Sequence, residues 1–513
     1  MAFVKPSSHS FRCTQTRTSG CVFNLLNPHQ NPTFTTSKKL ENTKHSYFNT
    51  LAKQRKQRSF GKYYWNEITN YCKYFSHEES SVLEVGCGSG DLLAKIEGSK
   101  KVGIDFSEEY IAWAKEKFAD KKNIEFYVMD ANNIQLNQTF DLIIISNLIG
   151  FVDDIQNVFE QVKKCCHPNT KVIVQFYNSF WEPAIKFSEL IGIKQKTPTQ
   201  NWLSTRDINN LLEISGFNVY RNSKRLIFPF FVPLLSFILN KYLAKFPFFR
   251  FFSLNIYSFA KPLPENNEEN YLNKYSTTVV IPARNESGNI ENAITRLPKF
   301  GKHTEIIFIE GNSTDDTWQK IQEIQKKYAG THDIKIGQQK GKGKGDAVRE
   351  GYKMATGDIL MILDADLTVP PEDLPKFYNA IASGKGDFIN GTRLVYPMDK
   401  EAMRFLNYLG NHFFSWAFTW LLDQRFKDTL CGTKVMFRKD YLKLIKNRAY
   451  FGEFDPFGDF DLLFGAHKLN LKIVEVPIRY KERTYGSTNI SRFKHGVILL
   501  RMCAFASRKC KFI

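Results

Sequence analysis

The sequence predicts two α/β domains with mainly parallel sheets, joined by a short linker. The chain has 513 residues, which is too many for one hydrophobic core. Apolar strand-like runs alternate with helical patterns over residues 45–260, and the alternation restarts after residue 274. The stretch between them, residues 261–274, is polar and proline-bearing, as linkers are. We therefore expect one domain over residues 45–260 and a second over residues 275–513.

Residues 1–44 are expected to lie outside both domains. The first 40 residues contain no Asp or Glu but many Ser, Thr, Lys and Arg. This composition is typical of an organelle targeting segment and equally of a disordered extension, and both interpretations stay open. No apolar run reaches the roughly 18–20 residues that cross a bilayer. We expect a protein of the cytoplasm or of the cytoplasmic face of a membrane.

The net charge of +19 predicts acidic partners, such as phosphorylated ligands or anionic membranes. The basic residues do not gather on one helix or stripe, so nucleic acid is not expected as a partner. The nine cysteines show no paired C-x-x-C spacing, which indicates reduced thiols rather than a zinc site. Aromatic residues make up 14% of the chain, with 45 Phe, and this richness fits contact with lipid.

Two apolar segments are candidates for contact with a membrane surface. Residues 226–239 are short and hold two prolines, and Lys241, Lys245 and Arg250 follow them. The side chains that recur there at helical spacing are Leu235, Ile238, Leu239, Tyr242, Leu243 and Phe246. Such a helix could lie in a membrane interface or pack on its own domain. The same two interpretations apply to "GVILLRMCAF", residues 496–505.

In the N-terminal half, "SVLEVGCGSGDLLAKI" predicts a strand, a glycine turn and a helix. Gly86, Gly88 and Gly90 allow the backbone to approach a ligand at the start of the helix. The dinucleotide fingerprint requires a glycine at the position of Asp91. Because an acid there would repel a pyrophosphate, we expect a nucleoside without phosphates.

Polar side chains stand where the neighbouring strands end. Asp105 ends the second strand, where a carboxylate accepts hydrogen bonds from ribose hydroxyls. Asp130 ends the third strand, placed to meet an adenine amine, and Ser146 and Asn147 end the fourth. Glu84, just before the glycines, could take the amino group of an amino-acid moiety.

In this order the features resemble the class I S-adenosylmethionine-dependent methyltransferases, over roughly residues 60–220. The resemblance implies a Rossmann-like fold with S-adenosyl-L-methionine as cofactor. It implies that Glu84 and the three glycines surround the methionine portion, with Asp105 on the ribose and Asp130 on the adenine. The two aspartates after the fourth strand are explained equally well as a helix start, and the methyl acceptor cannot be read. A non-catalytic binding module is the alternative.

The C-terminal half begins with two strand–turn–helix units. In "TTVVIPARNE" the strand ends at Pro282 and Ala283, and Asn285 and Glu286 follow at the expected cleft. In "TEIIFIEGNSTDDT" the strand ends at Glu310. The glycine- and lysine-rich "GKGKG" that comes later predicts either a solvated loop or a phosphate cradle, without the spacing of a Walker A loop.

Two acids then follow an apolar run in "ILMILDADL", residues 359–367. Residues two apart on an extended chain share a face, so we expect Asp364 and Asp366 to point the same way. Two carboxylates suit Mg²⁺ or Mn²⁺, which completes its shell with phosphates and water. The ion would neutralise a diphosphate leaving group. The alternative is an acid pair that caps the helix after "PPEDL".

The segments "VVIPARNE", "IEGNSTDDT", "GKGDAVREG", "LDADLTVPPEDL" and "GTRL" resemble family 2 glycosyltransferases of GT-A fold, over about residues 276–495. The most similar branch is the dolichyl- or polyprenyl-phosphate mannosyl- and glucosyltransferases. The resemblance implies a nucleotide sugar (GDP-mannose or UDP-glucose), a polyprenyl phosphate acceptor and a divalent metal on the two aspartates. The nucleotide-sugar site it implies consists of Pro282, Ala283, Asn285, Glu286, Glu310, Asp364 and Arg393. Gly311 departs from the branch, which has a second acid there.

The resemblance also implies the residues that complete the site. The catalytic residues it implies are Asp366, Asp461 and Arg483, with Arg483 near the acceptor phosphate; Asp459 is the alternative to Asp461 at the acidic position of the branch. Thr488 and Asn489 replace the usual Ser-Lys after that arginine. A phosphate acceptor is already anionic, so it needs nearby cations rather than a general base. A sugar hydroxyl would need a general base, and Asp461 is the candidate for that role. We expect a bifunctional transferase; the alternative is transfer to a saccharide hydroxyl with an accessory methyltransferase half.

Overall fold

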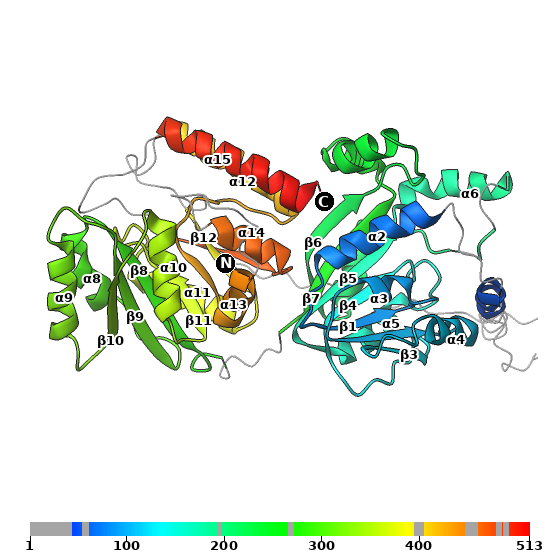
Figure 1. Cartoon of the computed structure of the whole chain (residues 1–513), viewed down its shortest axis with the longest axis horizontal. Helices are drawn as coiled ribbons and strands as arrows, with labels where there is room; N and C mark the ends of the chain where they lie inside the picture. Colours follow the sequence, from blue (N-terminus) through cyan, green and yellow to red (C-terminus); the bar gives the residue numbers. More distant parts are fainter. Residues whose placement is uncertain are drawn as a thin grey trace, which may run out of the picture.

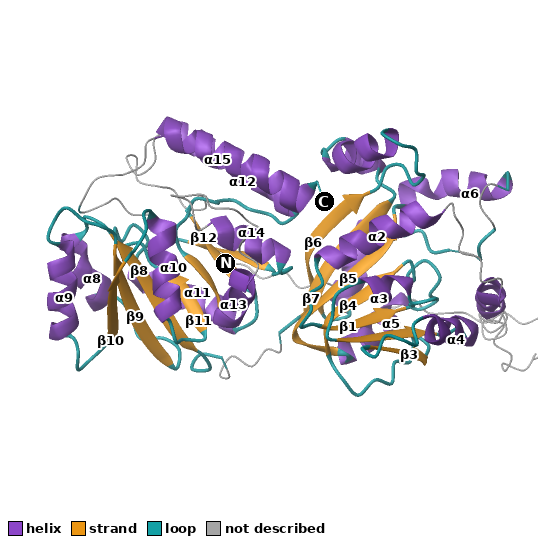
Figure 2. Ribbon diagram, in the orientation of Figure 1, coloured by secondary structure: helices purple, strands orange, loops and turns teal. Residues whose placement is uncertain are grey.

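The chain folds into two α/β halves that lie side by side along its long axis (Figure 1). The computed structural model describes residues 44–53, 61–192, 196–198, 200–264, 271–393, 405–446, 460–478, 485 and 492–512. Each half contains a mixed sheet with helices on both faces (Figure 2). The predicted fold class is therefore confirmed.

The first sheet has seven strands within the described residues, in the order β3-β2-β1-β4-β5-β7-β6. Six of them run in the same direction, and β7 runs antiparallel between β5 and β6. The strands are β1 (Ser81–Val85), β2 (Lys100–Asp105), β3 (Ile124–Val128), β4 (Phe140–Ser146), β5 (Cys166–Tyr177), β6 (Phe217–Arg225) and β7 (Asn255–Pro262). The helices are α2 (Lys62–Tyr74), α3 (Asp91–Lys95), α4 (Glu108–Lys117), α5 (Ile155–Lys164), α6 (Glu182–Leu190) and α7 (Thr205–Ile214).

The strands of this sheet are apolar at successive positions because helices bury both of its faces. Val82 packs with Ile68 of α2 and Leu92 of α3 on one face. Leu83, the next residue, packs with Val158 of α5 on the opposite face. The carboxyl ends of the parallel strands therefore carry the polar residues at one edge, as the sequence predicted.

The second sheet has the order β10-β9-β8-β11-β13-β12-β14 within the described residues. β10, β9, β8 and β11 are parallel, whereas β13 runs antiparallel to both of its neighbours. The strands are β8 (Ser276–Ala283), β9 (His303–Glu310), β10 (Asp333–Gln338), β11 (Ile359–Ile362), β12 (Phe388–Thr392), β13 (Lys434–Phe437) and β14 (Ile473–Pro477). The helices are α8 (Ile290–Thr295), α9 (Thr317–Lys327), α10 (Lys344–Met354), α11 (Leu374–Ala382), α12 (Phe405–Leu422), α13 (Arg438–Lys446), α14 (Phe460–Lys468) and α15 (Arg492–Ala506).

The structure describes only part of the predicted linker, residues 261–274. β7 continues to Pro262, and residues 265–270 lie outside the described part of the chain. Of the expected N-terminal extension, residues 1–43 also lie outside it, and its last residue, Lys44, begins a helix that continues to residue 53. Within the part that is described, no helix combines the length and the apolar character needed to cross a bilayer.

Two buried acids of the C-terminal half bind cations of the N-terminal half. Asp387, just before β12, accepts hydrogen bonds from Lys171 of β5 and Lys261 of β7. Asp423, just after α12, pairs with Arg250 at 2.8 Å. Burial by itself would raise the pKa of both carboxyls, but the cations outweigh it and hold each pKa below its usual range. The two halves are thus joined by charges that water cannot screen.

Candidate functional sites at the sheet edges

The glycine turn after β1 has a backbone conformation that glycine adopts readily. Gly86, Gly88 and Gly90 have φ values of 76°, 49° and 71°, in the left-handed region that favours glycine. A Cβ on Gly90 would lie 2.6 Å from the Phe126 ring, so this glycine permits close packing. A Cβ on Gly88 would meet nothing within 4 Å. The open space in front of Gly88 is where a ligand could approach the backbone.

Two buried carboxylates hold this turn. Asp105 accepts hydrogen bonds from the backbone N–H groups of Gly88 and Ser107, both at 2.9 Å. Glu84 accepts one from the backbone N–H of Leu93 in α3, at 3.1 Å. Burial raises the pKa of Asp105. Burial also raises the pKa of Glu84 well above its usual range, and the negative charge of Asp105 raises it further. The structure brings Glu84, the glycines and Asp105 together, while their roles toward a cofactor stay predictions.

The third and fourth strands contribute polar groups to the same edge. Asp130 is exposed after β3 and accepts hydrogen bonds from the backbone and side-chain nitrogens of Asn132, at 2.8 and 3.1 Å. Asn147 follows β4 with a φ of 52°, and its backbone N–H donates to Gln175. The Tyr64 hydroxyl of α2 donates to the Asn147 side chain at 3.0 Å. Tyr64 was missed from the sequence, because nothing local ties α2 to the end of β4.

The helix formed by residues 44–53 lies over the loops that follow β2 and β4. The Phe48 ring packs edge-on against Phe106 and Phe151, with centroid distances of 5.7 and 5.2 Å. These two phenylalanines follow Asp105 and Asn147 in the chain, at the edge where the cofactor is expected. This helix therefore covers part of the candidate cofactor site, and no sequence pattern indicated it.

The two aspartates after β4 act at the start of α5. Asp154 caps that helix by accepting the backbone N–H of Asn157 at 2.9 Å. Asp153 pairs with Lys44 of the helix 44–53, at 2.5 Å. The helix-start interpretation is therefore confirmed for Asp154.

In the C-terminal half, side-chain hydrogen bonds join the loops after β8 and β9. Asn285 has a φ of 56°. Its backbone N–H donates to the Ser313 hydroxyl at 3.1 Å, and its side-chain oxygen accepts a hydrogen bond from the backbone N–H of Thr314 at 2.8 Å. The N–H of Glu286 donates to the Thr317 hydroxyl at 3.0 Å. The two predicted nucleotide loops therefore form one unit.

Glu310 is buried beneath this unit. Its carboxylate accepts the N–H of Ser313 at 2.5 Å and the side-chain amide of Gln338 at 3.1 Å. The next residue, Gly311, donates its N–H to the carbonyl of Ala283 at 2.8 Å, beside Pro282. Glu310 thus shapes the loop that carries Ser313, and its direct contact with a nucleotide base stays a prediction.

Asp364 and Asp366 lie in a turn rather than on an extended strand. β11 ends at Ile362, and the N–H of Leu367 donates to the carbonyl of Asp364 at 3.1 Å. Leu367 has a φ of 50°, which closes the turn. The expectation that the pair shares a face because the chain is extended is therefore wrong. Asp366 accepts hydrogen bonds from the N–H and the hydroxyl of Thr368, at 3.1 and 2.8 Å, and so does not cap a helix.

Lys344 pairs with Asp364 at 2.5 Å. This lysine opens α10 in the glycine- and lysine-rich loop, which fits the phosphate-cradle interpretation of that loop. A Cβ on Gly432 would overlap both the Asp364 carboxylate and the Lys344 ammonium, so the glycine gives them room. The loops after β10 and β11 and before β13 thus meet at one edge of the second sheet.

The residues present fit a divalent cation that takes few protein ligands. Asp364 and Asp366 are half-buried, with hard oxygen ligands of the kind that Mg²⁺ prefers. Within the described residues, no group of three or more His, Cys, Asp and Glu side chains gathers to hold a metal. Such an ion would complete its shell with phosphate oxygens and water, as Mg²⁺ usually does.

Arg393 binds a carboxylate of its own domain. Its guanidinium donates to both oxygens of Asp428, at 2.6 and 2.9 Å, and its backbone N–H donates at 3.0 Å. Burial would raise the pKa of Asp428, but the guanidinium outweighs burial and lowers it. Arg393 is thereby fixed just after β12. Asp461 is buried in the first turn of α14.

Arg483, which is predicted to bind the acceptor phosphate, lies outside the described residues. The same holds for the nearby residues Arg479, Lys481, Thr488 and Asn489. Tyr485 of the same segment is described: its hydroxyl lies 3.1 Å from the Ser287 hydroxyl, and its ring fills the space in front of Gly288. This tyrosine, missed from the sequence, brings the C-terminal segment to the loop after β8.

Comparison with known proteins supports both halves. Residues 278–445 match the model of glycosyl transferase family 2, and residues 82–169 match that of a methyltransferase domain. The resemblance of each half to its family is therefore confirmed, as is the predicted class, a transferase.

Two curated relatives and one solved structure illustrate the similarity. The chain is 40% identical to a dolichol-phosphate mannosyltransferase of Pyrococcus furiosus over 121 residues, which are 23% of this chain and only a third of that protein. It is 29% identical to the dolichyl-phosphate beta-glucosyltransferase of Saccharomyces cerevisiae over 44% of this chain and 72% of the relative. A SAM dependent methyltransferase from Aquifex aeolicus superposes with a TM-score of 0.29, at 18% identity, over 41% of this chain and 97% of that structure.

Proposed function

We propose that this chain, a glycosyl transferase family 2 domain joined to a methyltransferase domain, is a bifunctional transferase of a membrane surface. Its C-terminal half transfers a hexose, with inversion, from a nucleotide sugar such as GDP-mannose or UDP-glucose to polyprenyl phosphate. Its N-terminal half uses S-adenosyl-L-methionine to methylate an acceptor. The observation that carries the proposal is the meeting of the loops after β8, β9, β10 and β11 at one sheet edge, inside the matched segment.

The acceptor class is inferred from the chemistry of the site and from the names of the relatives. Two curated relatives are transferases named for dolichol phosphate or dolichyl phosphate. A phosphomonoester is anionic at neutral pH, so it attacks without a general base but needs cations to approach a diphosphate. Lys344 supplies one cation at the aspartate turn. We expect Arg483 to supply another.

The residues of this half bind and orient rather than exchange protons. The Asn285–Ser313–Thr314 unit holds the nucleotide loops in one arrangement. Asp364 and Asp366 would hold Mg²⁺ or Mn²⁺, which when bound neutralises the diphosphate leaving group. Arg393, fixed by Asp428, keeps the end of β12 beside this turn.

For the N-terminal half, the proposal rests on the turn that Asp105 holds. A ribose hydroxyl could donate to the same carboxylate that accepts the Gly88 N–H, next to the open space at that glycine. Methyl transfer depends mainly on the alignment of the sulfonium carbon with its acceptor, so positioning by the turn suffices to explain the chemistry. The acceptor is expected in the same pathway as the glycolipid, because one chain carries both domains.

The sugar-transfer part is tested with radiolabelled GDP-mannose and UDP-glucose, dolichyl phosphate and Mn²⁺. Label should enter the lipid extract, and Asp366→Asn should reduce the rate by about 100-fold, equivalent to ~2.7 kcal/mol. Asp373→Asn is the matched control, because this acid is seven residues further on and pairs only locally, with Lys376. Label that appears in free sugar or in water-soluble saccharide, and never in lipid, would contradict the polyprenyl acceptor.

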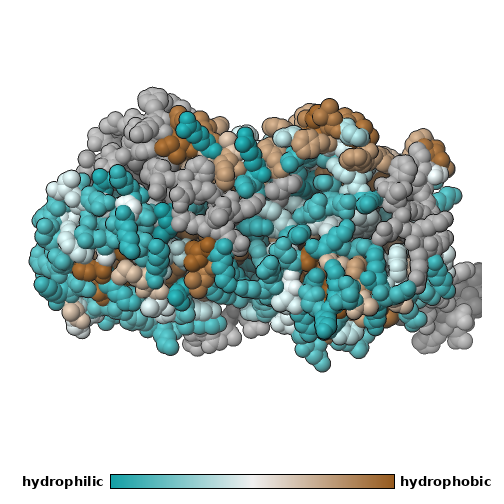
Figure 3. All heavy atoms as spheres, in the orientation of Figure 1, coloured by the Kyte–Doolittle hydropathy of each residue, from teal (hydrophilic) through white to brown (hydrophobic). Residues whose placement is uncertain are grey.

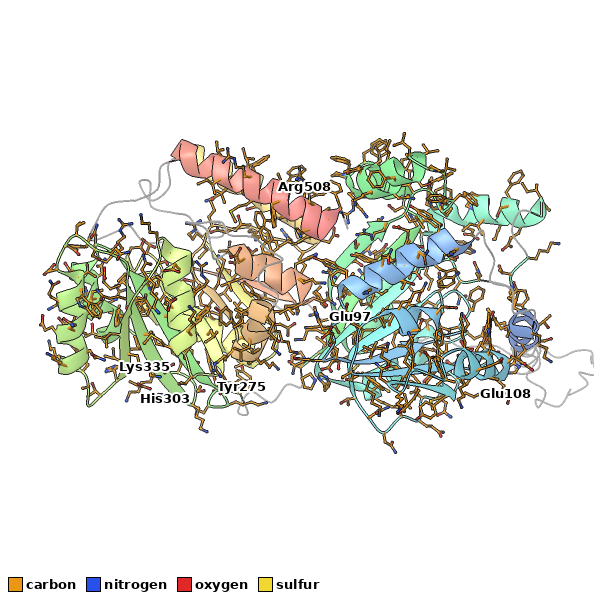
Figure 4. The ribbon with its side chains drawn as sticks, viewed as in Figure 1. Glu97, Glu108, Tyr275, His303, Lys335 and Arg508 are labelled. Carbon is orange, nitrogen blue, oxygen red and sulfur yellow. The ribbon has the colours of Figure 1, made fainter. Side chains whose placement is uncertain are left out.

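The methyltransferase part is tested by calorimetric titration with S-adenosyl-L-methionine. Binding should be lost in Asp105→Ala and retained in Glu108→Ala, an exposed acid three residues away at the start of α4 (Figure 4). Equal affinities of both variants, or no binding by the native chain, would reduce this half to an accessory module.

A further inference from the structure

A segment of the N-terminal half exposes large apolar side chains at more than half of its positions. We call residues 230–251 the aromatic segment. Its exposed apolar residues are Phe230, Phe231, Val232, Leu234, Leu235, Phe237, Ile238, Tyr242, Phe246, Phe248, Phe249 and Phe251. They form much of the hydrophobic surface at the upper right of Figure 3. Patches of this kind on a folded protein mark sites of contact with another surface.

The aromatic segment is an ordered part of the fold. The buried Asn240 side chain donates to the Tyr63 hydroxyl at 3.1 Å and to the Phe228 carbonyl at 2.7 Å. The Ser236 hydroxyl donates to the carbonyl of Phe230 at 2.8 Å and accepts the N–H of Val232. Because polar side chains inside the segment satisfy its backbone, the phenylalanines are held outward by the structure itself.

Aromatic contacts join this segment to the C-terminal half. The Phe246 ring stacks on Trp420 of α12, with centroids 6.2 Å apart, and the Trp420 indole N–H donates to the carbonyl of Lys245 at 2.7 Å. Phe512, next to the C-terminus, contacts both Tyr242 and Trp420 at 5.3 and 6.0 Å. The segment and the end of α12 are therefore one continuous surface.

Helices α12 and α15 extend the surface over the second half. The two helices pack against each other and lie at the upper edge of Figure 1, beside the aromatic segment. Phe413 and Trp416 are exposed on α12, and Val497 and Leu500 are exposed on α15. α12 contains no Asp, Glu, Lys or Arg at all.

The two chain segments that form most of this surface carry basic residues and no acids. Residues 214–264 and residues 484–513 contain no Asp or Glu. Arg501 and Arg508 are exposed on the C-terminal helix, and Figure 4 shows Arg508 on the same side of the molecule as the aromatic segment. Exposed apolar side chains with basic residues at their border match the interface of an anionic bilayer.

We propose that the aromatic segment, α12 and α15 form one docking face for an anionic membrane, with the aromatic segment entering the headgroup region. This proposal rests on the proposed function in one respect, namely that the acceptor of the sugar transfer is a membrane lipid. All positions from 230 to 238 are exposed except Ser236. Binding to a bilayer interface grows with the apolar area that it buries and with the attraction of basic residues to anionic lipids, and this face offers both. Both active halves are thereby oriented on one surface.

Vesicle co-sedimentation tests this face directly. The full chain should bind phosphatidylcholine vesicles that contain phosphatidylserine, and bind less in high salt. Leu235→Gln should weaken the binding about threefold, and the triple variant Phe231→Ser, Leu235→Gln and Phe248→Ser at least about tenfold. The matched control is Leu272→Gln, since Leu272 and Leu235 are 47% and 46% exposed and Leu272 belongs to the turn before β8, outside the proposed docking face. Figure 4 shows Tyr275, three residues further on, at the lower edge of the molecule.

Several outcomes would overturn the proposal. One is that the full chain does not bind vesicles, and another is that Leu272→Gln weakens vesicle binding as much as Leu235→Gln does. A third is that the chain sediments as a dimer, which the triple variant dissociates without any change in vesicle binding. Sugar transfer to a short, water-soluble polyprenyl phosphate is measured in parallel and should survive the triple variant. A chain that binds vesicles but transfers no sugar would leave the docking face standing and contradict the proposed function.

Discussion

The buried charges between the two halves give the sharpest prediction of stability. Asp387, Lys261 and Lys171 have side chains that are 6%, 3% and 11% exposed, and the two lysines share this one carboxylate. Asp387→Asn preserves shape but removes the carboxylate that both ammonium groups bind. Breaking a buried ion pair from one side costs about 3–5 kcal/mol. With a denaturant slope of about 3 kcal/mol per M, the urea midpoint should fall by about 1 to 1.7 M.

The control is an exposed pair that also joins the two halves. Lys446 of α13 lies 2.6 Å from Glu79, with side chains 66% and 63% exposed. Glu79→Gln should leave the urea midpoint unchanged, because water screens this pair. If Asp387→Asn shifts the midpoint no more than Glu79→Gln does, the two halves are not held by the buried cluster and the reasoning fails.

The other predictions concern the two sheet edges and the domain interface. Gly432→Ala should reduce sugar transfer at least about tenfold in a radiolabel assay, by displacing the aspartate turn, whereas Gly410→Ala, whose added methyl meets open space, should not. Gly90→Ala should destabilise the chain by about 1–2 kcal/mol or more in thermal unfolding, because its φ is 71° and the methyl would press on Phe126. Burial and nearby lysines lower the pKa of His77 to about 4, so the unfolded chain binds a proton that the folded chain rejects. The free energy of unfolding should therefore be highest above pH 6.5 and should fall as the pH is lowered from 6.5 to about 4. Urea unfolding of the native chain, compared with His77→Gln over this pH range, measures the effect.

The positions of the strands along the chain and the polar groups at their ends could be predicted because both follow local rules. A strand buried on both faces is an unbroken apolar run, and its first polar residue marks the sheet edge. Asp105 and Glu310 end β2 and β9 for that reason. The end of β11 could not be located in this way, since Leu363 is still apolar and buried while the chain already leaves the sheet. The aspartate turn was missed for the same reason.

Partners that are distant in sequence escaped prediction because no spacing rule connects them. Arg393 and Asp428 are 35 residues apart, and only the path of α12 between them brings the pair together. The contact of Tyr64 with the end of β4 depends equally on how α2 crosses the sheet. The sequence pattern therefore indicates the sheet edge at which a site residue lies. The polar groups that this residue binds depend on tertiary packing, which the pattern does not show.

The buried interface and the proposed membrane face involve the same elements. Asp423 follows directly on α12, whose Trp420 holds the aromatic segment, and binds Arg250 within that segment. Asp387 precedes β12, the strand that leads to Arg393. A substitution that loosened these contacts would therefore alter the angle between the two halves and the position of the sugar-transfer edge above the lipid. The interface explains how one chain could keep two active edges at fixed heights above a single membrane.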